Sequence, residues 1–537
     1  MSGLAATFGV LARTDNEAAV SLLIAALDSP RAALQEAALG AILDRRSPAG
    51  QREILRRLPA QGDRWRPTID ARRGRMATAL RDAVLGSDPQ LCASACQAIL
   101  WFHEYDLMTA LLTAAEDETN PNSKLALDTL VELARLLYDE LAQPRDYRNR
   151  RDPQTLRRNA VGALEAAVAR YGKHRRREIV ESFLLLVYRD NATLQQILHD
   201  AHHVASVPVA DLLATSEQGG VVRLLLSLLE DPHAPHVALT SLARRSDPKF
   251  VEHLLRKIGS EPSKTIALNL KRIEQFAWLH GGHDVVDQLD GLGQYAVVQL
   301  AVHSGMKRRE AFELVRHLLA AGKAEGRRAA VQALAEFTGA DANALVVRAL
   351  DDEDPLVQAG AAAQLRSRGI QGALGRLIEL LDSPHAAVAQ AARDSLAEFN
   401  ARRFLASFDM LDEEARRTTG ALVKKIDPRT VPLIKEELSV HSRTRRLRAL
   451  RMAVVVGVAP WVETEVIVLL GDEDHVVRSE AAAALGACRS PTATAAVQSA
   501  LADRSQIVRE AAAGALEQMQ RTLADEEPAS AGPGGRA

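Results

Sequence analysis

Apolar residues occur along the chain in short blocks whose spacing places them on one face of a helix. Residues 477–485 carry one such block and residues 508–516 carry another. Within each block the apolar residues recur at intervals of three and four, as in an amphipathic helix. Short turns rich in Asp, Ser, Pro and Gly separate the blocks, and these residues end one helix and cap the next. The pattern predicts helices joined by short turns.

The helical blocks repeat at a nearly fixed interval. Arg478 and Arg509 are 31 residues apart, and so are Leu485 and Leu516. The same closing apolar position recurs towards the N-terminus in steps of 27 to 34 residues. It is occupied by Leu516, Leu485, Val455, Val423, Leu396, Leu365, Leu334, Leu300, Leu270 and Leu242. This period predicts a stack of helix pairs that bury their apolar faces against one another.

The period is regular only in the second part of the chain. Residues 1–205 are expected to form an irregular helical-repeat array with longer helices, and residues 221–520 a regular one. The segment 206–220 interrupts the periodicity and is predicted to be the junction. Residues 521–537 end in a stretch rich in Pro and Gly, which predicts a disordered tail.

Composition agrees with a helical core of small side chains. Hydrophobic residues make up 47% of the chain, but aromatic residues only 4%. The core must therefore be built mainly from Ala, Leu and Val, and small side chains let helices approach closely. Ala and Leu also favour helix formation. The predicted fold class is all-α.

The repeat resembles the HEAT repeat, especially the short type found in bacteria and shared with phycobilin lyase subunits and deoxyhypusine hydroxylase. The resemblance is carried by Asp354, Pro355, Val357, Ala361, Ala362 and Leu365, and by Val477, Arg478, Ala481, Ala482 and Leu485. It implies an armadillo-like helical fold, a right-handed α-α superhelix. In HEAT arrays, Asp in the turn and Arg in the second helix often form a ladder between repeats. The residues that fit this structural role are Asp472, Asp474, Arg478, Asp503 and Arg509.

Candidate catalytic chemistry is sparse in this sequence. Deoxyhypusine hydroxylase-like proteins hold two irons with paired His-Glu motifs, whereas this chain has the single pair at 103–104, so that activity is excluded. His199, His202 and His203 would share a face of a helix and are weak candidates for metal ligands; the alternative is a solvated or partner-facing helix end. No Gly-rich phosphate loop or nucleophile elbow is present. We therefore expect no catalytic centre, no resident metal and no cofactor.

Most of the arginine clusters lie in the first 200 residues, although the net charge of the whole chain is only −2. The candidates for binding an anion or a partner are Arg64, Arg66, Arg72, Arg73, Arg145, Arg148, Arg150, Arg151, Arg175, Arg176 and Arg177. Such clusters can hold phosphate groups of nucleic acids. They can equally form a solvated face that pairs with neighbouring carboxylates.

The favoured function is a non-catalytic scaffold or adaptor that binds protein partners, whose identity the sequence does not give. One alternative is binding of nucleic acid or a phosphate ligand through the N-terminal arginines. A second is a lyase-like or metal-dependent auxiliary subunit. The three cysteines are too few for a disulfide framework, and the sequence leads us to expect neither a signal peptide nor a membrane-spanning run. A cytoplasmic location is expected.

Overall fold

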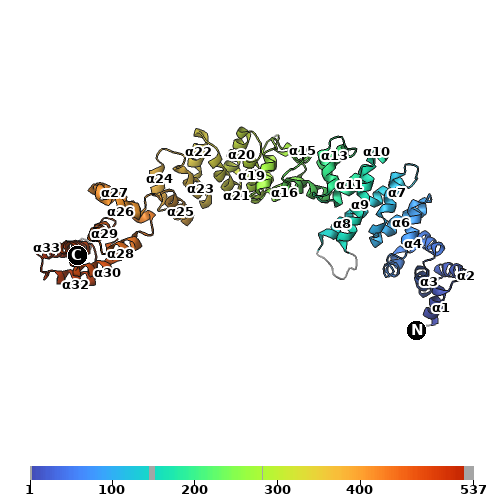
Figure 1. Ribbon diagram of the computed structural model, residues 1–537, viewed down its shortest axis with the longest axis horizontal. Coiled ribbons are helices and arrows are strands. Elements are labelled where there is room, and N and C mark those ends of the chain that lie inside the picture. Colours follow the sequence, from blue (N-terminus) through green and yellow to red (C-terminus); the bar gives the residue numbers. More distant parts are fainter. Residues whose placement is uncertain (1–2, 144–151, 281, 525–537) are drawn as a thin grey trace, which may run out of the picture. The chain divides into compact units, whose positions relative to one another are not determined.

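The computed structural model describes residues 3–143, 152–280 and 282–524, and its regular elements over these ranges are all helices (Figure 1). The all-α prediction is therefore confirmed. The chain divides into two compact units, Met1–Ala311 and Phe312–Ala537.

The first unit contains α1 (Gly3–Arg13), α2 (Ala18–Leu27), α3 (Ala32–Arg45), α4 (Pro48–Asp70), α5 (Ala77–Leu85), α6 (Pro89–Phe102), α7 (Met108–Glu116), α8 (Ser123–Ala142), α9 (Pro153–Ala169), α10 (Tyr171–His174), α11 (Arg177–Leu186), α12 (Ala192–His199), α13 (Ser206–Thr215), α14 (Gly219–Ser227), α15 (His236–Arg244), α16 (Pro248–Ile258), α17 (Lys264–Leu270), α18 (Asp284–Gln288) and α19 (Gly291–His303). Helix α20 (Arg308–Ala321) begins in the first unit and ends in the second. The second unit continues with α21 (Ala324–Ala333), α22 (Ala340–Ala349), α23 (Pro355–Leu365), α24 (Ala373–Leu380), α25 (Ala386–Ser395), α26 (Ala401–Ser407), α27 (Glu413–Ile426), α28 (Thr430–Leu438), α29 (Arg443–Val455), α30 (Glu463–Val468), α31 (His475–Leu485), α32 (Pro491–Ala500) and α33 (Gln506–Ala524). Short 3-10 turns are η1 (Tyr105–Leu107), η2 (Leu228–Glu230), η3 (Ala277–Leu279), η4 (Leu334–Glu336), η5 (Phe408–Met410), η6 (Ala459–Val462) and η7 (Leu469–Gly471).

Polar residues in the turns start the helices, as the turn composition predicts. The Asp354 carboxylate accepts a hydrogen bond from the backbone N–H of Leu356, and Pro355 occupies the first position of α23. Asp474 accepts from the N–H groups of Val476 and Val477 at the start of α31. These caps satisfy backbone donors that have no partner inside the helix.

The second unit is built from helix pairs that stack in two layers. Helices α22 and α23, α24 and α25, α28 and α29, α30 and α31, and α32 and α33 form pairs. The second helices of successive pairs pack together, for example α23 with α25 and α31 with α33. The residues on these contact faces are small and completely buried, as at Ala361, Ala362, Ala481 and Ala482. Each pair thus covers the apolar face of the next.

The sequence-based division of the chain differs from the division into compact units. The predicted junction, residues 206–220, lies inside the first unit, where α13 and the first two residues of α14 occupy most of it. The expected difference between an irregular array before this junction and a regular array after it stays a prediction. At the C-terminus, α33 continues to Ala524, four residues into the predicted tail, because neither Pro nor Gly occurs there before Pro528. Residues 525–537 lie outside the described residues.

No single helix in the described part of the chain is both long and apolar enough to cross a membrane. One pair, residues 206–215 and 219–230, meets that test only when its two helices are taken together, and these are bent by 105°.

Candidate functional site

Of the ladder residues, Arg478 makes the most complete set of contacts. Its Nε and Nη2 donate to the two carboxylate oxygens of Asp503 at 2.9 and 3.0 Å. Its Nη1 donates to the carbonyl oxygens of Asp472 and Glu473. The side chain of Arg478 is only 4% exposed. The hydrogen bond from Arg478 holds the pKa of Asp503 below its usual value. Arg478 therefore ties α31 to the turn that precedes α33.

The other ladder candidates take related positions. The Asp472 carboxylate lies 3.0 Å from Arg446, and the Asp474 carboxylate lies 2.7 Å from Arg443. Arg509 donates to the backbone oxygen of Asp503 and not to its carboxylate. These contacts connect one repeat with the next, so the carboxylates and guanidinium groups are used within the protein.

Most described arginines of the 64–75 cluster are used for local contacts. The Arg72 and Arg75 guanidinium groups both pair with Asp44, and Arg73 pairs with Asp70. Arg66 lies over the ring of Trp101 at 5.8 Å, and Arg64 is exposed. Three guanidinium groups in the turn that follows α4 are therefore paired with carboxylates of the protein itself.

The second arginine group is only partly described. Arg145, Arg148, Arg150 and Arg151 lie outside the described residues. Arg175 ends α10 in a left-handed conformation with φ 49°, and Arg176 precedes α11. Arg177 forms an ion pair with Asp211 at 2.9 Å and donates to Thr215.

The histidine cluster does not have the helical geometry on which its metal-binding interpretation depends. Helix α12 ends at His199, so His202 and His203 lie in the following turn and not on the same helical face. His199 Nδ1 is hydrogen-bonded to the Gln195 carbonyl, and His203 Nδ1 accepts from the N–H of Ala205. Asp200, which caps this turn by accepting from the N–H of His202, explains the early helix end. Over the described ranges, no group of three or more His, Cys, Asp or Glu side chains could hold a metal ion.

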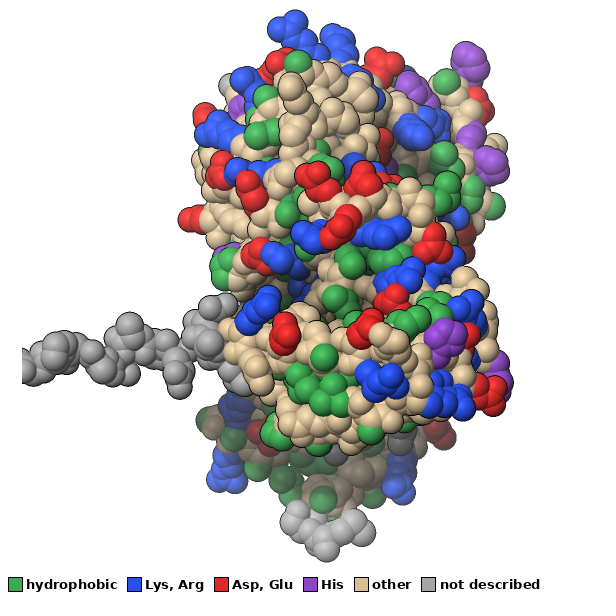
Figure 2. All heavy atoms as spheres, turned by 90° about the vertical axis from the view of Figure 1, so that its left-hand side faces the viewer, with side chains coloured by type: hydrophobic (Ala, Val, Ile, Leu, Met, Phe, Trp, Pro, Cys, Tyr) green, Lys and Arg blue, Asp and Glu red, His purple; other side chains and the backbone are tan. Residues whose placement is uncertain are grey.

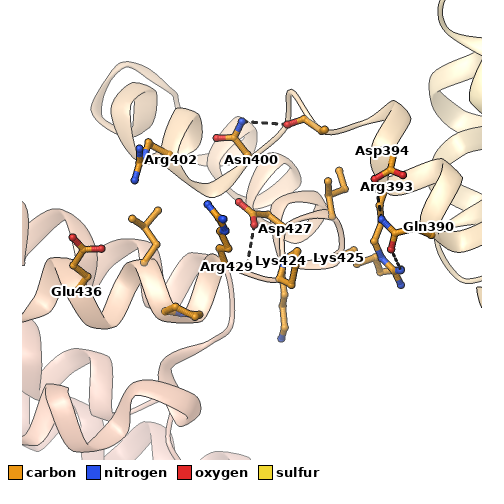
Figure 3. Close-up of a pocket in the computed structure, with 15 residues that line it drawn as sticks. Gln390, Arg393, Asp394, Asn400, Arg402, Lys424, Lys425, Asp427, Arg429 and Glu436 are labelled. Atoms are coloured by element: carbon orange, nitrogen blue, oxygen red, sulfur yellow. Dashed lines mark hydrogen bonds between the residues drawn. The ribbon is translucent and has the colours of Figure 1, made fainter.

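A hollow of about 990 Å³ in the second unit was not predicted from the sequence. It lies between α25 and the helices α26, α27 and α28, where α25 packs only sparsely against α26 and α27. The hollow is lined by five basic and three acidic residues. We call it the basic hollow, and its basic residues are Arg393, Arg402, Lys424, Lys425 and Arg429 (Figure 3).

The lysines of the basic hollow are held by other parts of the chain. Lys425 pairs with Asp382 at 2.6 Å. Lys424 donates to the carbonyl of Gly457 at 2.9 Å and lies 4.4 Å from the ring centre of Trp461, which is 57% exposed. This cation–π contact leaves a large aromatic surface beside the hollow.

The arginines of the basic hollow have fewer partners. Among the residues that the structure describes, no carboxylate lies within ion-pair distance of Arg393, Arg402 or Arg429. Arg402 and Arg429 occupy one side of the hollow and Arg393 the other (Figure 3).

Acidic residues of the hollow do not neutralise these arginines. The Asp427 carboxylate instead accepts from the backbone N–H groups of Ala401 and Arg429, at 2.9 and 2.8 Å. Asp394 accepts a hydrogen bond from Gln390. Glu436, the third acidic residue of the hollow, forms no ion pair with the three arginines among the described residues, and the charge of Arg402 acts on Glu437 only at a distance. The three guanidinium groups, each without an ion-pair partner, make the hollow attractive to an anionic group.

Basic and acidic side chains are mixed on the face of the molecule that Figure 2 draws. Figure 2 shows Lys and Arg side chains interspersed with Asp and Glu side chains over the face that it draws, with no broad field of one sign. One sequence signal pointed to the region of the basic hollow: the step from Leu396 to Val423, 27 residues, is the shortest in the series. A shorter step alone does not reveal a cavity, because the cavity depends on how α25 meets the following helices.

Comparison with family models places HEAT repeats at residues 296–397 and 462–530. These two segments are HEAT repeats. Most of the residues that line the basic hollow lie between these two segments, in a part of the chain that the family model does not match. No curated protein matches the sequence.

Solved structures with a similar helical-repeat architecture share little sequence with this chain. A structure from a study of the interaction between cadherin and beta-catenin is 14% identical, with a TM-score of 0.38, over 93% of this chain and 99% of that one. A Kap95p structure with RanGDP is 13% identical, with a TM-score of 0.27, over 97% and 82%. Kap121p bound to Ste12p is 12% identical, with a TM-score of 0.25, over 90% and 53%. These are likenesses of fold alone.

Proposed function

We propose that this HEAT-repeat protein is a non-catalytic scaffold that binds a protein partner, and that the basic hollow receives an acidic segment of that partner. HEAT arrays present extended surfaces suited to such binding. The observation that carries the proposal is the set of three arginines, Arg393, Arg402 and Arg429, that have no carboxylate partner within the described residues. Guanidinium groups bind carboxylates in a directional, often bidentate manner.

The shape of the hollow also suits a peptide segment. Pro428, Pro432 and Leu433 contribute apolar surface between the basic side chains. Such a surface can bind the backbone and apolar side-chain atoms of an extended peptide, while the arginines bind the carboxylates of that peptide. The arginines of the 64–75 cluster are largely paired within the protein, which favours a protein partner over a nucleic acid. We place this function in the cytoplasm, on the basis of the unpaired cysteines Cys92, Cys96 and Cys488.

Charge reversal in the hollow tests the proposal. The full-length variant Arg402→Glu/Arg429→Glu is compared with Arg403→Glu/Arg504→Glu, which has the same net charge but changes exposed arginines outside the hollow. Proteins that co-purify with the wild type from extracts of its own cells are identified, and the affinity of each is measured with purified components. We expect at least one partner to bind the hollow variant with a Kd about tenfold or more above that of the wild type, which is equivalent to about 1.4 kcal/mol. The same partner should bind the control variant with the Kd of the wild type.

The interaction should also weaken as salt concentration rises, because exposed charges are screened. Retention of the same partners with equal affinity by both variants would contradict a role for the basic hollow. Binding of purified RNA or DNA that is lost in the hollow variant would assign the site to a nucleic acid instead.

A further inference from the structure

A second group of arginines, in the first unit, surrounds a tyrosine. The guanidinium carbon of Arg157 in α9 lies 3.3 Å from the ring centre of Tyr188. The guanidinium carbon of Arg223 in α14 lies 5.0 Å from the same ring centre and 5.3 Å from that of Tyr138. Tyr188 itself follows the end of α11. Three segments far apart in the sequence thus bring two guanidinium groups to one aromatic ring. The contact with the ring holds the guanidinium planes in position.

The two guanidinium groups have no carboxylate partner. Over the described ranges, no Asp or Glu oxygen lies within ion-pair distance of Arg157 or Arg223. Arg157 donates to the carbonyl of Leu186 at 2.8 Å and to the amide oxygen of Gln154, and Arg223 donates to the carbonyl of Val187 at 3.4 Å. The Nε of Arg223 is buried and has no hydrogen-bond partner.

Electrostatics at this pair are unfavourable without a further anion. Burial lowers the pKa of Arg157, and the positive charge of Arg223 lowers it further, while Tyr188 and Asp190 partly oppose this effect. Asp190 is exposed and forms no ion pair with either arginine. The carboxylate of Glu230 pairs with Arg189 and Lys257 instead. Two positive charges therefore remain close together at the end of α11.

A hollow of about 320 Å³ adjoins Arg223 and Tyr188. Arg189, Asp190, Ser227 and Glu230 also line it, so two carboxylates face the hollow, and Arg157 is not among its lining residues but reaches the site through its contact with the ring of Tyr188. A water molecule takes up about 30 Å³ in the liquid. The space is therefore large enough for a tetrahedral anion and the first atoms of whatever carries it.

We propose that Arg157, Tyr188 and Arg223 form a binding site for a phosphate monoester group. This site goes beyond the scaffold function and lies outside the basic hollow. A phosphate monoester carries a charge of about −1.5 to −2 at neutral pH, which matches two guanidinium groups without ion-pair partners. A carboxylate carries only a single negative charge. The phosphate oxygens can accept from N–H groups of the Arg223 guanidinium, which lines the hollow, in bidentate geometry. The phosphate comes either from a small molecule or from a phosphorylated side chain of a partner.

Capping of α11 is the purely structural alternative for these arginines. Leu186 and Val187 lie at the C-terminal end of α11, where carbonyl groups lack helical partners and cations are stabilising. Glutamine at either arginine position keeps an N–H donor for these carbonyls but removes the positive charge. Arg157→Gln and Arg223→Gln therefore separate capping from anion binding. Arg158→Gln is the matched control, since Arg158 is the exposed neighbour on α9.

Isothermal titration of the full-length protein measures binding of inorganic phosphate, a phosphoserine peptide, its unphosphorylated form and acetate. We expect saturable binding of phosphate or of the phosphopeptide by the wild type and Arg158→Gln. The Kd should rise at least about tenfold in Arg223→Gln and in Arg157→Gln, because each loses a charge-assisted contact of about 1.5 kcal/mol or more. Circular dichroism checks that each variant is folded, and either folded variant is sufficient for the test.

The outcomes distinguish the sources of the phosphate. Binding of inorganic phosphate with no gain from the peptide supports a small-molecule ligand, and preference for the phosphopeptide supports a modified partner. No saturable binding of either probe, equal binding of acetate, or unchanged affinity in a folded Arg223→Gln variant would overturn the proposal.

Discussion

At the scale of single residues, arginine has two different roles in this protein. Arg478 is buried, and its charge is matched by Asp503. Arg402 and Arg429 are exposed and have no carboxylate partner among the described residues. A buried charge must be compensated inside the protein because removing it from water is costly. An exposed guanidinium group is not under this constraint, so its charge is available to a ligand.

The Arg478–Asp503 contact is expected to stabilise the C-terminal repeats. Arg478→Met removes the charged donor from two carbonyl groups and from the Asp503 carboxylate, which keeps only the N–H of Ser505, and we expect this to cost about 1.5–3 kcal/mol. Hydrogen exchange measured by mass spectrometry should show a large loss of protection in α31 and α33.

The control is Arg521→Met, since Arg521 and Glu517 form an ion pair with side chains 81% and 68% exposed. Its effect should stay below about 1 kcal/mol. Equal protection in Arg478→Met and the control would contradict a stabilising role.

At the scale of helices, close approach depends on small residues at the crossing points. A Cβ atom at Gly360 in α23 would lie 2.8 Å from Val331 Cγ1 in α21. A Cβ atom at Gly514 in α33 would have no atom within 4 Å. The two glycines are both helical, so the difference between them comes from packing and not from backbone conformation.

Alanine at these two glycines should therefore change stability in opposite directions. Alanine favours a helix over glycine by about 1 kcal/mol, whereas overpacking at a tight contact costs about 1–3 kcal/mol. Gly360→Ala should lower the free energy of unfolding because Val331 must move. Gly514→Ala should raise it by up to about 1 kcal/mol. Thermal unfolding followed by circular dichroism measures both, and a stabilised Gly360→Ala protein would show that α21 and α23 can separate without cost.

At the scale of the whole molecule, stability is expected to arise within each compact unit. In a repeat array, helix pairs contact mainly their sequence neighbours, so a long enough part can fold alone. The second unit begins at Phe312, within α20, and contains the continuous core of residues 401–519.

A fragment of residues 306–537, which retains all of α20, should fold independently. Far-ultraviolet circular dichroism should show a helical spectrum and a cooperative thermal transition. A second fragment, residues 359–537, begins inside α23 and lacks part of the surface that covers α25. It should unfold at a lower temperature. A fragment 306–537 without helical structure would show that the second unit requires the first.

The local sequence determined the helices, their pairing and the residues that begin them, because helix periodicity, capping and small-residue faces are properties of neighbouring positions. The all-α helical-repeat architecture followed from these features. Tertiary structure decided which charges remain available. Whether Arg72 is neutralised depends on Asp44, which is 28 residues away, and whether Arg402 and Arg429 face a hollow depends on how α25 meets α26 and α27. The end of α12 at His199 likewise separated histidines that a continuous helix would have aligned. Binding sites in a repeat array are formed by residues of different repeats, so their geometry depends on packing between helices and not on spacing along the chain.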